Sequence, residues 1–346
     1  MSNERTMKRY RLVSLFSGCG GVDLGFLGDF EFLGNKYAPL PFEIVWANDI
    51  NEYACKVYQA NFGNHIELGD ISKINFQKVA PAYQNADILL AGFPCQEFSF
   101  MGLRRGLTSV RGRLYQEMRR AIRHFKPKMF LAENVPGIQH PPNVLRRIIN
   151  DLKGRKSPLY EIKYYQVDAA DYGVPQLRKR VFIVGTRTDL PKTFIPPPAT
   201  HCSPDGLNDH RKAWVTTKDA LDSLWDPGGT IGDTNDQEKL THATIHFRKG
   251  RPRDGQANPN TPCTIIRAEH HGHVQVHYNT LSNGSLRRLT IRECARIQGF
   301  PDLFTFPVST TQAYRQIGNA IPPILAYNWA VSIRDWLDNL ENGYTY

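Results

Sequence analysis

Short apolar runs alternate with helical stretches over the first 190 residues of the chain. This pattern predicts strands at residues 12–16, 43–48, 87–92, 129–132, 160–167 and 181–185, and helices at 52–61, 114–125 and 144–152. Strands that alternate with helices form βαβ units and a mostly parallel sheet covered on both faces. Ligands bind outside the carboxyl ends of such strands, so the residues that follow them are the first candidates for a site.

The pattern changes near residue 190. Three consecutive prolines, 196–198, precede a segment rich in Gly, Asn, His and Pro that extends to about residue 285. Its weak periodicity predicts a second, smaller, irregular domain. Helical periodicity returns at residues 290–298 and again at 323–340. The whole pattern therefore predicts an α/β fold with a smaller second domain.

Composition narrows the class of protein. The chain has 346 residues, 41% of them hydrophobic, and a formal net charge of +10. That charge favours a polyanionic partner, nucleic acid or an anionic membrane surface, although it also serves plain solubility. No apolar run approaches the roughly 20 residues of a membrane helix, and residues 1–16 do not match a signal peptide. The six scattered cysteines include no CxxC pair, which argues against a disulfide framework or zinc ribbon and for a cytoplasmic location.

Glycines and acids follow three successive strands. Residues 16–21 form a glycine-rich turn, which is either a tight structural turn or a close approach to a ligand. Asp23 breaks the GxGxxG dinucleotide pattern and so argues against NAD. Asp49 stands where an acid typically binds ribose, and Asp70 is either a helix N-cap or the partner of an exocyclic amine, with Ile71 as an apolar lid on the base. Together these signals favour an adenosine-containing cofactor.

Cys95 follows the next predicted strand in a Pro-Cys turn. A lone cysteine is ordinarily buried filler, but nine Lys or Arg and only one acid lie between residues 101 and 128. A positive field favours a thiolate nucleophile and also suits contacts with a phosphate backbone. The glycines within residues 101–112 predict a mobile loop there.

Charged residues also end the neighbouring strands. Glu133 comes at a strand end, from which its carboxyl group could act as a general acid in the same pocket as Cys95. Arg178 and Arg180 alternate on an extended segment, so both are predicted to point the same way and to hold one oxyanion or base carbonyl.

Six short motifs follow one another along the chain: FSGCGG (16–21), AGFPCQ (91–96), ENV (133–135), QLRKR (176–180), RRLTIRECARIQGFP (287–301) and QIGNA (316–320). In this order the chain resembles the C5-cytosine DNA methyltransferase family, of the bacterial restriction–modification type, over nearly its whole length. The resemblance implies a Rossmann-like mixed sheet that binds S-adenosylmethionine and a target-recognition domain, with double-stranded DNA between them. It also implies a discontinuous catalytic domain, residues 1–190 and 305–346, with residues 191–304 as the recognition domain and hinge.

The resemblance further implies a covalent mechanism. Cys95 would add to C6 of a cytosine flipped out of the duplex, while Glu133 supports protonation at N3, so that C5 accepts the methyl group. A base would then remove the C5 proton, and Cys95 would leave. The supporting residues would be Pro94 and Asn134 for positioning, Arg178 for the base O2, and Arg180 for Glu133 or a nearby phosphate.

The resemblance assigns the remaining candidates by position. The cofactor would lie against Phe16, Gly18, Gly20, Gly21, Asp49, Ile50, Asp70, Ile71 and Asn319. DNA contacts are expected from Gln96, Met101, Arg104, Arg105, Arg111, Arg113, Arg248, Arg251, Arg267 and His271. Met101 stands where the family often carries a small residue, and we expect it to act as an apolar wedge.

The sequence also leaves alternative functions open and suggests which partners to expect. A tRNA cytosine-C5 methyltransferase is the nearest rival, and a DNA-binding module without catalysis is another. No metal is expected, because Cys263 and the nearby histidines match no zinc spacing. We expect a monomer with no obligate protein partner and no membrane association, which protects host DNA from a cognate endonuclease. The sequence leaves the recognition site on the DNA open.

Overall fold

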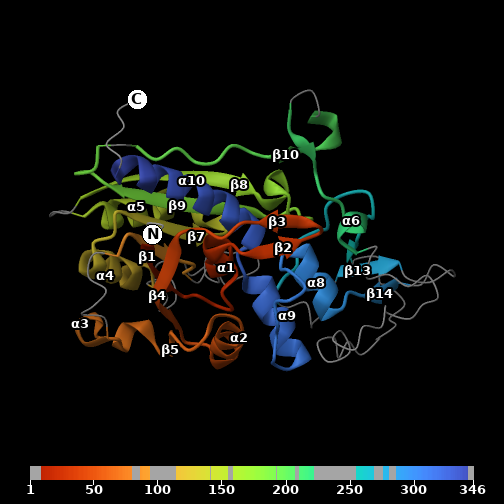
Figure 1. The fold of residues 1–346 in the computed structure, drawn as a ribbon, viewed down its shortest axis with the longest axis horizontal. Coiled ribbons are helices and arrows are strands. Elements are labelled where there is room, and N and C mark those ends of the chain that lie inside the picture. The colour runs from red at the N-terminus through yellow and green to blue at the C-terminus, as the bar shows by residue number, and fades with distance from the viewer. Residues whose placement is uncertain are drawn as a thin grey trace, which may run out of the picture.

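The computed structural model describes residues 9–79, 86–93, 114–140, 142–154, 159–191, 193–206, 210–221, 255–268, 276–279 and 286–341. At its centre lies a seven-stranded sheet in the order β5-β4-β1-β6-β7-β9-β8 (Figure 1). Its strands are β1 (Tyr10–Leu15), β4 (Phe42–Asp49), β5 (Ile66–Leu68), β6 (Ile88–Ala91), β7 (Met129–Asn134), β8 (Tyr160–Asp168) and β9 (Lys179–Arg187). Neighbouring strands of this sheet run parallel, except that β9 is antiparallel to both β7 and β8. The carboxyl ends of β5, β4, β1, β6 and β7 therefore meet at one edge.

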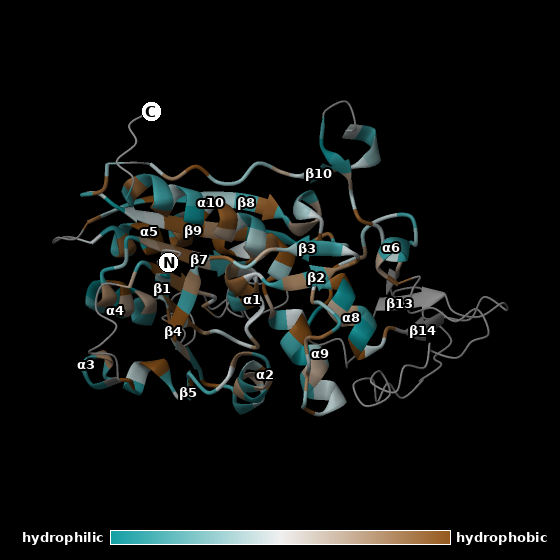
Figure 2. Ribbon diagram, in the orientation of Figure 1, coloured by the Kyte–Doolittle hydropathy of each residue, from teal (hydrophilic) through white to brown (hydrophobic). Residues whose placement is uncertain are grey.

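Helices cover both faces of the sheet. One face packs against α1 (Gly21–Leu27), α2 (Glu52–Phe62) and α10 (Pro323–Glu341), and the other against α3 (Phe76–Val79), α4 (Tyr115–Phe125) and α5 (Pro142–Lys153). Leu12 and Val13 are neighbours on β1 but belong to different cores, because successive side chains of a strand point to opposite faces. Figure 2 shows the hydrophobic strands enclosed between the helices. This mixed α/β architecture confirms the predicted fold class.

Each predicted strand and helix has a counterpart in this arrangement. Several described elements have none among the predicted ranges, among them the helices α1 and α3, the edge strand β5 and helix α9 (Thr310–Asn319). The antiparallel hairpin of β2 (Phe30–Phe32) and β3 (Asn35–Tyr37) also lies outside the predicted ranges. Strands of three residues are too short to give a periodic signal, so they escape a prediction from pattern.

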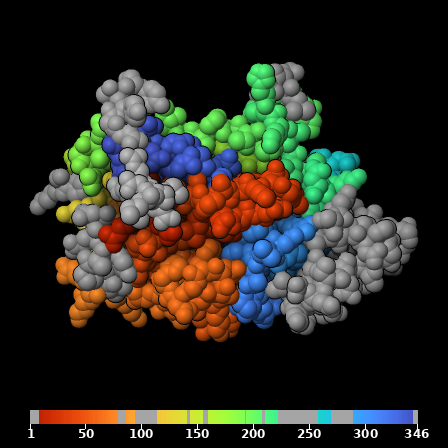
Figure 3. Space-filling view, in the orientation of Figure 1, coloured from red at the N-terminus to blue at the C-terminus, as the bar shows by residue number. Residues whose placement is uncertain are grey.

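A third core lies beside the sheet. It contains residues of α6 (Thr217–Leu221), α8 (Ile291–Ile297) and α9, together with Cys19 and Val57 from the first part of the chain. The space-filling view shows the blue α8–α9 region directly against the red and orange N-terminal segments (Figure 3). The division into domains at residues 190 and 305 stays a prediction.

The remaining elements are short. They are the strands β10 (His201–Cys202), β11 (Lys212–Ala213), β12 (Gly255–Gln256), β13 (Val276–Asn279) and β14 (Leu286–Arg288), and the 3-10 turns η1 (Ile71–Lys73), η5 (Pro136–Gln139), η6 (Ala169–Tyr172) and η7 (Pro204–Gly206). Of the helices that the structure describes, none has the length and apolar character that crossing a membrane requires.

Candidate active site

The glycine-rich turn after β1 has an unusual backbone. Phe16, Gly18 and Gly20 all have positive φ values, 54°, 57° and 88°. A side chain on Gly18 would meet nothing within 4 Å, whereas one on Gly21 would lie 2.4 Å from the carbonyl oxygen of Ile321. Gly21 is therefore required by packing against the C-terminal segment, while Gly18 leaves open space that a ligand can approach.

Asp49 at the end of β4 fixes this turn. Its Oδ2 accepts a hydrogen bond from the Gly18 amide (2.8 Å), and its Oδ1 accepts one from the Asn51 amide (2.8 Å). Burial raises the pKa of Asp49, and these backbone hydrogen bonds oppose that shift. Ile50 beside it is 69% exposed, which is unusual for so large an apolar side chain.

Asp70 follows β5 and caps the turn η1. Its Oδ1 accepts hydrogen bonds from the amide (3.0 Å) and the hydroxyl (2.8 Å) of Ser72, and these bonds lower the pKa of Asp70. The N-cap that the sequence left open is confirmed. Oδ2 has no hydrogen-bond partner among the described residues. Ile71 is only 3% exposed, so the exposed apolar surface here comes from Ile50 and Leu68 instead. We call Gly18, Asp49 and Asp70 the acid edge.

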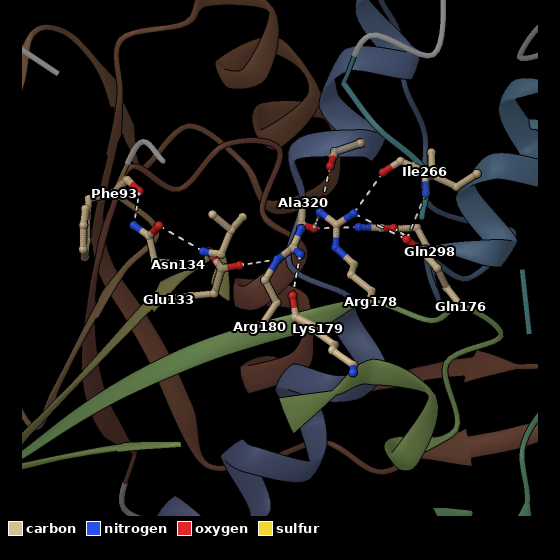
Figure 4. A network of polar contacts seen from close by, with 12 residues as sticks. Phe93, Glu133, Asn134, Gln176, Arg178, Lys179, Arg180, Ile266, Gln298 and Ala320 are labelled. Atoms are coloured by element: carbon tan, nitrogen blue, oxygen red, sulfur yellow. Dashed lines mark hydrogen bonds and ion pairs between the residues drawn. The ribbon is translucent and has the colours of Figure 1, made fainter. Parts of the chain in front are cut away.

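Glu133 and Arg180 meet between β7 and β9. Arg180 Nε lies 2.6 Å from Glu133 Oε1, and the two side chains are only 7% and 14% exposed (Figure 4). Asn134 Nδ2 donates to the carbonyl oxygen of Phe93 (3.2 Å), and Asn134 Oδ1 accepts from the Val135 amide. Phe93 is the last described residue before Pro94. This carboxylate, guanidinium and amide therefore gather where the chain leads into Pro94 and Cys95.

The Arg178 side chain contacts different groups from the Arg180 side chain. One terminal nitrogen donates to the carbonyl oxygen of Ile266 (2.9 Å), and the other donates to those of Gly318 (2.7 Å) and Ala320 (3.1 Å). The side chain is only 2% exposed. The two guanidinium groups have different protein partners (Figure 4), and the prediction that Arg178 and Arg180 together hold one oxyanion or base carbonyl stays a prediction.

Two glutamines complete the surroundings of Arg178. Gln176 Nε2 donates to Gln298 Oε1 (2.6 Å) and to the carbonyl oxygen of Ile297 (3.2 Å), and Gln176 Oε1 accepts from the Ile266 amide (3.1 Å). Gln298 Nε2 donates to the carbonyl oxygen of Ala320 (2.6 Å). Both glutamines are fully buried. We call this set, Gln176, Arg178, Ile266, Gln298 and Ala320, the Gln176 junction. Sequence reasoning missed both glutamines, since no local pattern marks a partner more than a hundred residues away.

The segment that carries Asn319 reaches both regions. Asn319 is the last residue of α9 and is exposed. A side chain on the preceding Gly318 would lie 2.3 Å from the backbone of Arg267, so the two segments touch there. Ala320 and Ile321 pack against Gly21 in the glycine-rich turn. The structure therefore brings Asn319 and Arg267 to segments that lie beside the turn and the junction.

Some of the nine Lys and Arg residues between positions 101 and 128, the basic cluster, make contacts within the protein. Lys128 pairs with Asp87 (2.8 Å) and Glu341 (3.6 Å), and Arg120 binds backbone carbonyl groups of residues 71 and 74. The following predicted site residues lie outside the described part of the chain: Pro94, Cys95, Gln96, Met101, Arg104, Arg105, Arg111, Arg113, Arg248, Arg251 and His271.

The cysteines that are described are reduced and buried. Burial raises the pKa of Cys19 to about 12, so this thiol is a poor nucleophile although it sits in the glycine-rich turn. Cys19, Cys55 and Cys294 are all packed in the interior. Within the described ranges, no cluster of His, Cys, Asp or Glu is suited to bind a metal ion.

Comparisons with known proteins agree with one another. A family profile described as C-5 cytosine-specific DNA methylase matches residues 10–335. The Type II methyltransferase M.NgoFVII of Neisseria gonorrhoeae is 34% identical, over 96% of this chain and 88% of that protein. M.NgoPII of the same organism is also 34% identical, over 97% of this chain and 99% of its own length. The crystal structure of an E. coli prophage-encoded protein, described as a DNA modification methyltransferase, has a TM-score of 0.65 and 25% identity and covers 96% of this chain and 99% of that one.

Proposed function

This chain belongs to the C-5 cytosine-specific DNA methylase family, and from that premise we propose how it acts. It methylates C5 of cytosine in DNA, as the family does. We propose S-adenosylmethionine as the methyl donor and a cytosine flipped out of a short, specific double-stranded sequence as the acceptor. The observation that carries the proposal is the buried Glu133–Arg180 pair, placed next to the segment that leads to Cys95.

The acid edge fits the proposed donor. The space beside Gly18 admits a ligand close to the backbone, and Asp70 Oδ2 is available to accept a hydrogen bond from the adenine amine. The Asp49 carboxylate has lone pairs left for the ribose hydroxyl groups, and the exposed Ile50 offers an apolar surface to the base. When bound, S-adenosylmethionine supplies an electrophilic methyl group. Phe16, Gly20, Gly21, Ile71 and Asn319 would complete its surroundings.

The acceptor requires activation, because C5 of cytosine is a weak nucleophile. The Cys95 thiolate forms a bond to C6 while N3 is protonated with the support of Glu133, which makes C5 nucleophilic. C5 would then accept the methyl group that S-adenosylmethionine supplies, with S-adenosylhomocysteine as the leaving group. A base removes the C5 proton, the C6–S bond breaks to restore the thiolate, and N3 returns its proton to Glu133. Arg180 holds Glu133 in place, and Asn134 fixes the carbonyl group before Pro94.

Arg178 has another role in this scheme. Since its terminal nitrogens donate to three backbone carbonyl groups, we do not assign it the contact with the base O2. We assign that contact to Arg180, whose side chain already lies beside Glu133. Arg178 then acts by fixing the strand on which Arg180 stands.

A trapping experiment tests the mechanism. Duplex DNA that carries 5-fluorocytosine at the target should form a covalent adduct that depends on S-adenosylmethionine, because the fluorine cannot leave as the proton does. Cys95→Ser should form none. An adduct with tRNA and none with DNA would establish the rival reading, which the DNA-specific family match and the named relatives disfavour.

The cellular role follows from the relatives, which are Type II methyltransferases. We propose that the protein acts as a monomer in the cytoplasm and protects host DNA from a cognate endonuclease. Recognition would involve Gln96, Met101, Arg104, Arg105, Arg111, Arg113, Arg248, Arg251, Arg267 and His271. Bisulfite sequencing of a plasmid expressed with the protein should reveal one short methylated sequence, and randomly scattered methylation would contradict this role.

A further inference from the structure

Arg120 lies on α4 and reaches down to the segment that follows β5. One terminal nitrogen donates to the carbonyl oxygen of Ile71 (2.5 Å) and the other to that of Ile74 (2.8 Å). Its Nε pairs with Glu117 (2.8 Å), and the guanidinium lies 4.0 Å from the ring centre of Phe76. All three nitrogens and one face of the guanidinium thus have partners.

These contacts fix the turn that Asp70 begins. Ile71 is the first residue of η1, and Ile74 follows the last, so the two carbonyl groups span the turn. Asp70 is the N-cap of the turn and holds its start through hydrogen bonds with Ser72. The Ile71 carbonyl oxygen also accepts a hydrogen bond from the Ile74 amide within the turn (3.3 Å), so Arg120 adds a second donor to Ile71 and supplies a donor to Ile74, which follows the turn. The position of Asp70 Oδ2 therefore depends on a side chain from another helix.

We propose that Arg120 is a positioning residue for the adenine of S-adenosylmethionine. It acts through the turn and does not contact the base. The inference rests on the proposed function, in which Asp70 Oδ2 accepts the adenine amine. The planar guanidinium reaches two carbonyl groups at once, in a geometry that an ammonium group does not reproduce. This assignment replaces the contact with DNA phosphate that the basic cluster suggests, because the three nitrogens face protein groups.

The test is a comparison of two ligands without DNA. S-adenosylhomocysteine carries the adenine amine, and S-inosylhomocysteine carries an oxygen in its place. Wild type should prefer the first, since Asp70 accepts from an amine and repels an oxygen. In Arg120→Ala the affinity for S-adenosylhomocysteine should fall at least tenfold in titration calorimetry, and the preference over S-inosylhomocysteine should shrink by a similar factor.

Two variants sharpen the result. Arg120→Lys keeps the charge but not the planar guanidinium that donates to two carbonyl groups. It should therefore restore little of the preference for S-adenosylhomocysteine. Arg146→Ala removes the same charge from an exposed position on the neighbouring helix α5, and it should leave both affinities at the wild-type value.

Each of the following outcomes would overturn the inference. Equal loss of both ligands in Arg120→Ala would indicate general damage to the fold. Unchanged affinities with a raised KM for DNA would indicate a phosphate contact, and full recovery in Arg120→Lys would indicate that charge alone matters. If wild type bound S-adenosylhomocysteine but the preference survived in Arg120→Ala, only this inference would fail. If wild type bound neither ligand, the proposed function would fail with it.

Discussion

The acid edge and the Gln176 junction use polar side chains in opposite ways. At the acid edge, carboxylates accept hydrogen bonds from backbone amides, as Asp49 does from Gly18, and Asp49 and Asp70 are only partly buried. At the junction, side-chain amides and a guanidinium donate to backbone carbonyl groups. The side chains of Gln176, Arg178 and Gln298 are all buried. One region is left open to a ligand, and the other is closed.

The difference predicts where substitutions act. A buried donor that is removed leaves its acceptors unsatisfied, which costs about 1–3 kcal/mol for each group. A half-exposed acceptor can be replaced by water at little cost to the fold. Substitutions at the junction should therefore lower the free energy of unfolding, and those at the acid edge should weaken ligand binding with little change in stability.

The largest effect is expected from Arg178→Met. The variant removes the donor to the carbonyl groups of Ile266, Gly318 and Ala320 while keeping much of the side-chain volume. The free energy of unfolding, measured by urea denaturation, should fall by about 3–5 kcal/mol. A loss below about 1 kcal/mol would mean that the junction tolerates unpaired carbonyl groups and that the comparison is wrong.

A smaller effect comes from Asp23, which lies on α1 directly after the acid-edge turn but is fully buried. Desolvation raises the pKa of Asp23 to about 7, and Tyr58 donates a hydrogen bond to it (3.4 Å). The folded protein then keeps a proton that the unfolded chain has released, so the free energy of unfolding falls as pH rises from about 4 to about 7. Asp23 therefore tests whether burial or the carboxylate group itself decides the effect on stability.

Asp23→Asn keeps the shape and removes the titration. Relative to wild type, the variant should gain about 2–4 kcal/mol in free energy of unfolding between pH 4.5 and pH 8, measured by urea denaturation at each pH. His65, which contacts Tyr58 from the other side, titrates in both proteins and cancels in the difference. Parallel pH curves for the two proteins would show that Asp23 is ionised in the fold without cost.

The same contrast explains what the sequence can predict. The strand at Ile88–Ala91 follows from a local apolar run, and the N-cap role of Asp70 follows from its position before Ile71 and Ser72. The pairing of Arg180 with Glu133 follows from the resemblance. The partners of Arg178 depend on where residues 266 and 318–320 lie in space, and contacts that span 88 to 142 residues of sequence leave no periodic trace. Local chemistry is thus predictable, whereas the long-range junction is not.

The smallest change in stability is expected at Asp70. Loss of an N-cap acceptor on a short, half-exposed turn costs about 0.5–2 kcal/mol, so Asp70→Ala should stay within this range in urea denaturation. Asp70→Asn keeps an oxygen for the Ser72 amide and should unfold like wild type. It places an amide group where the carboxylate Oδ2 stood, however, and a donor there opposes the adenine amine. Asp70→Asn should therefore bind S-adenosylhomocysteine at least fivefold more weakly at unchanged stability. An unchanged affinity would remove Asp70 from the ligand site, and the acid edge would then differ from the Gln176 junction in exposure alone.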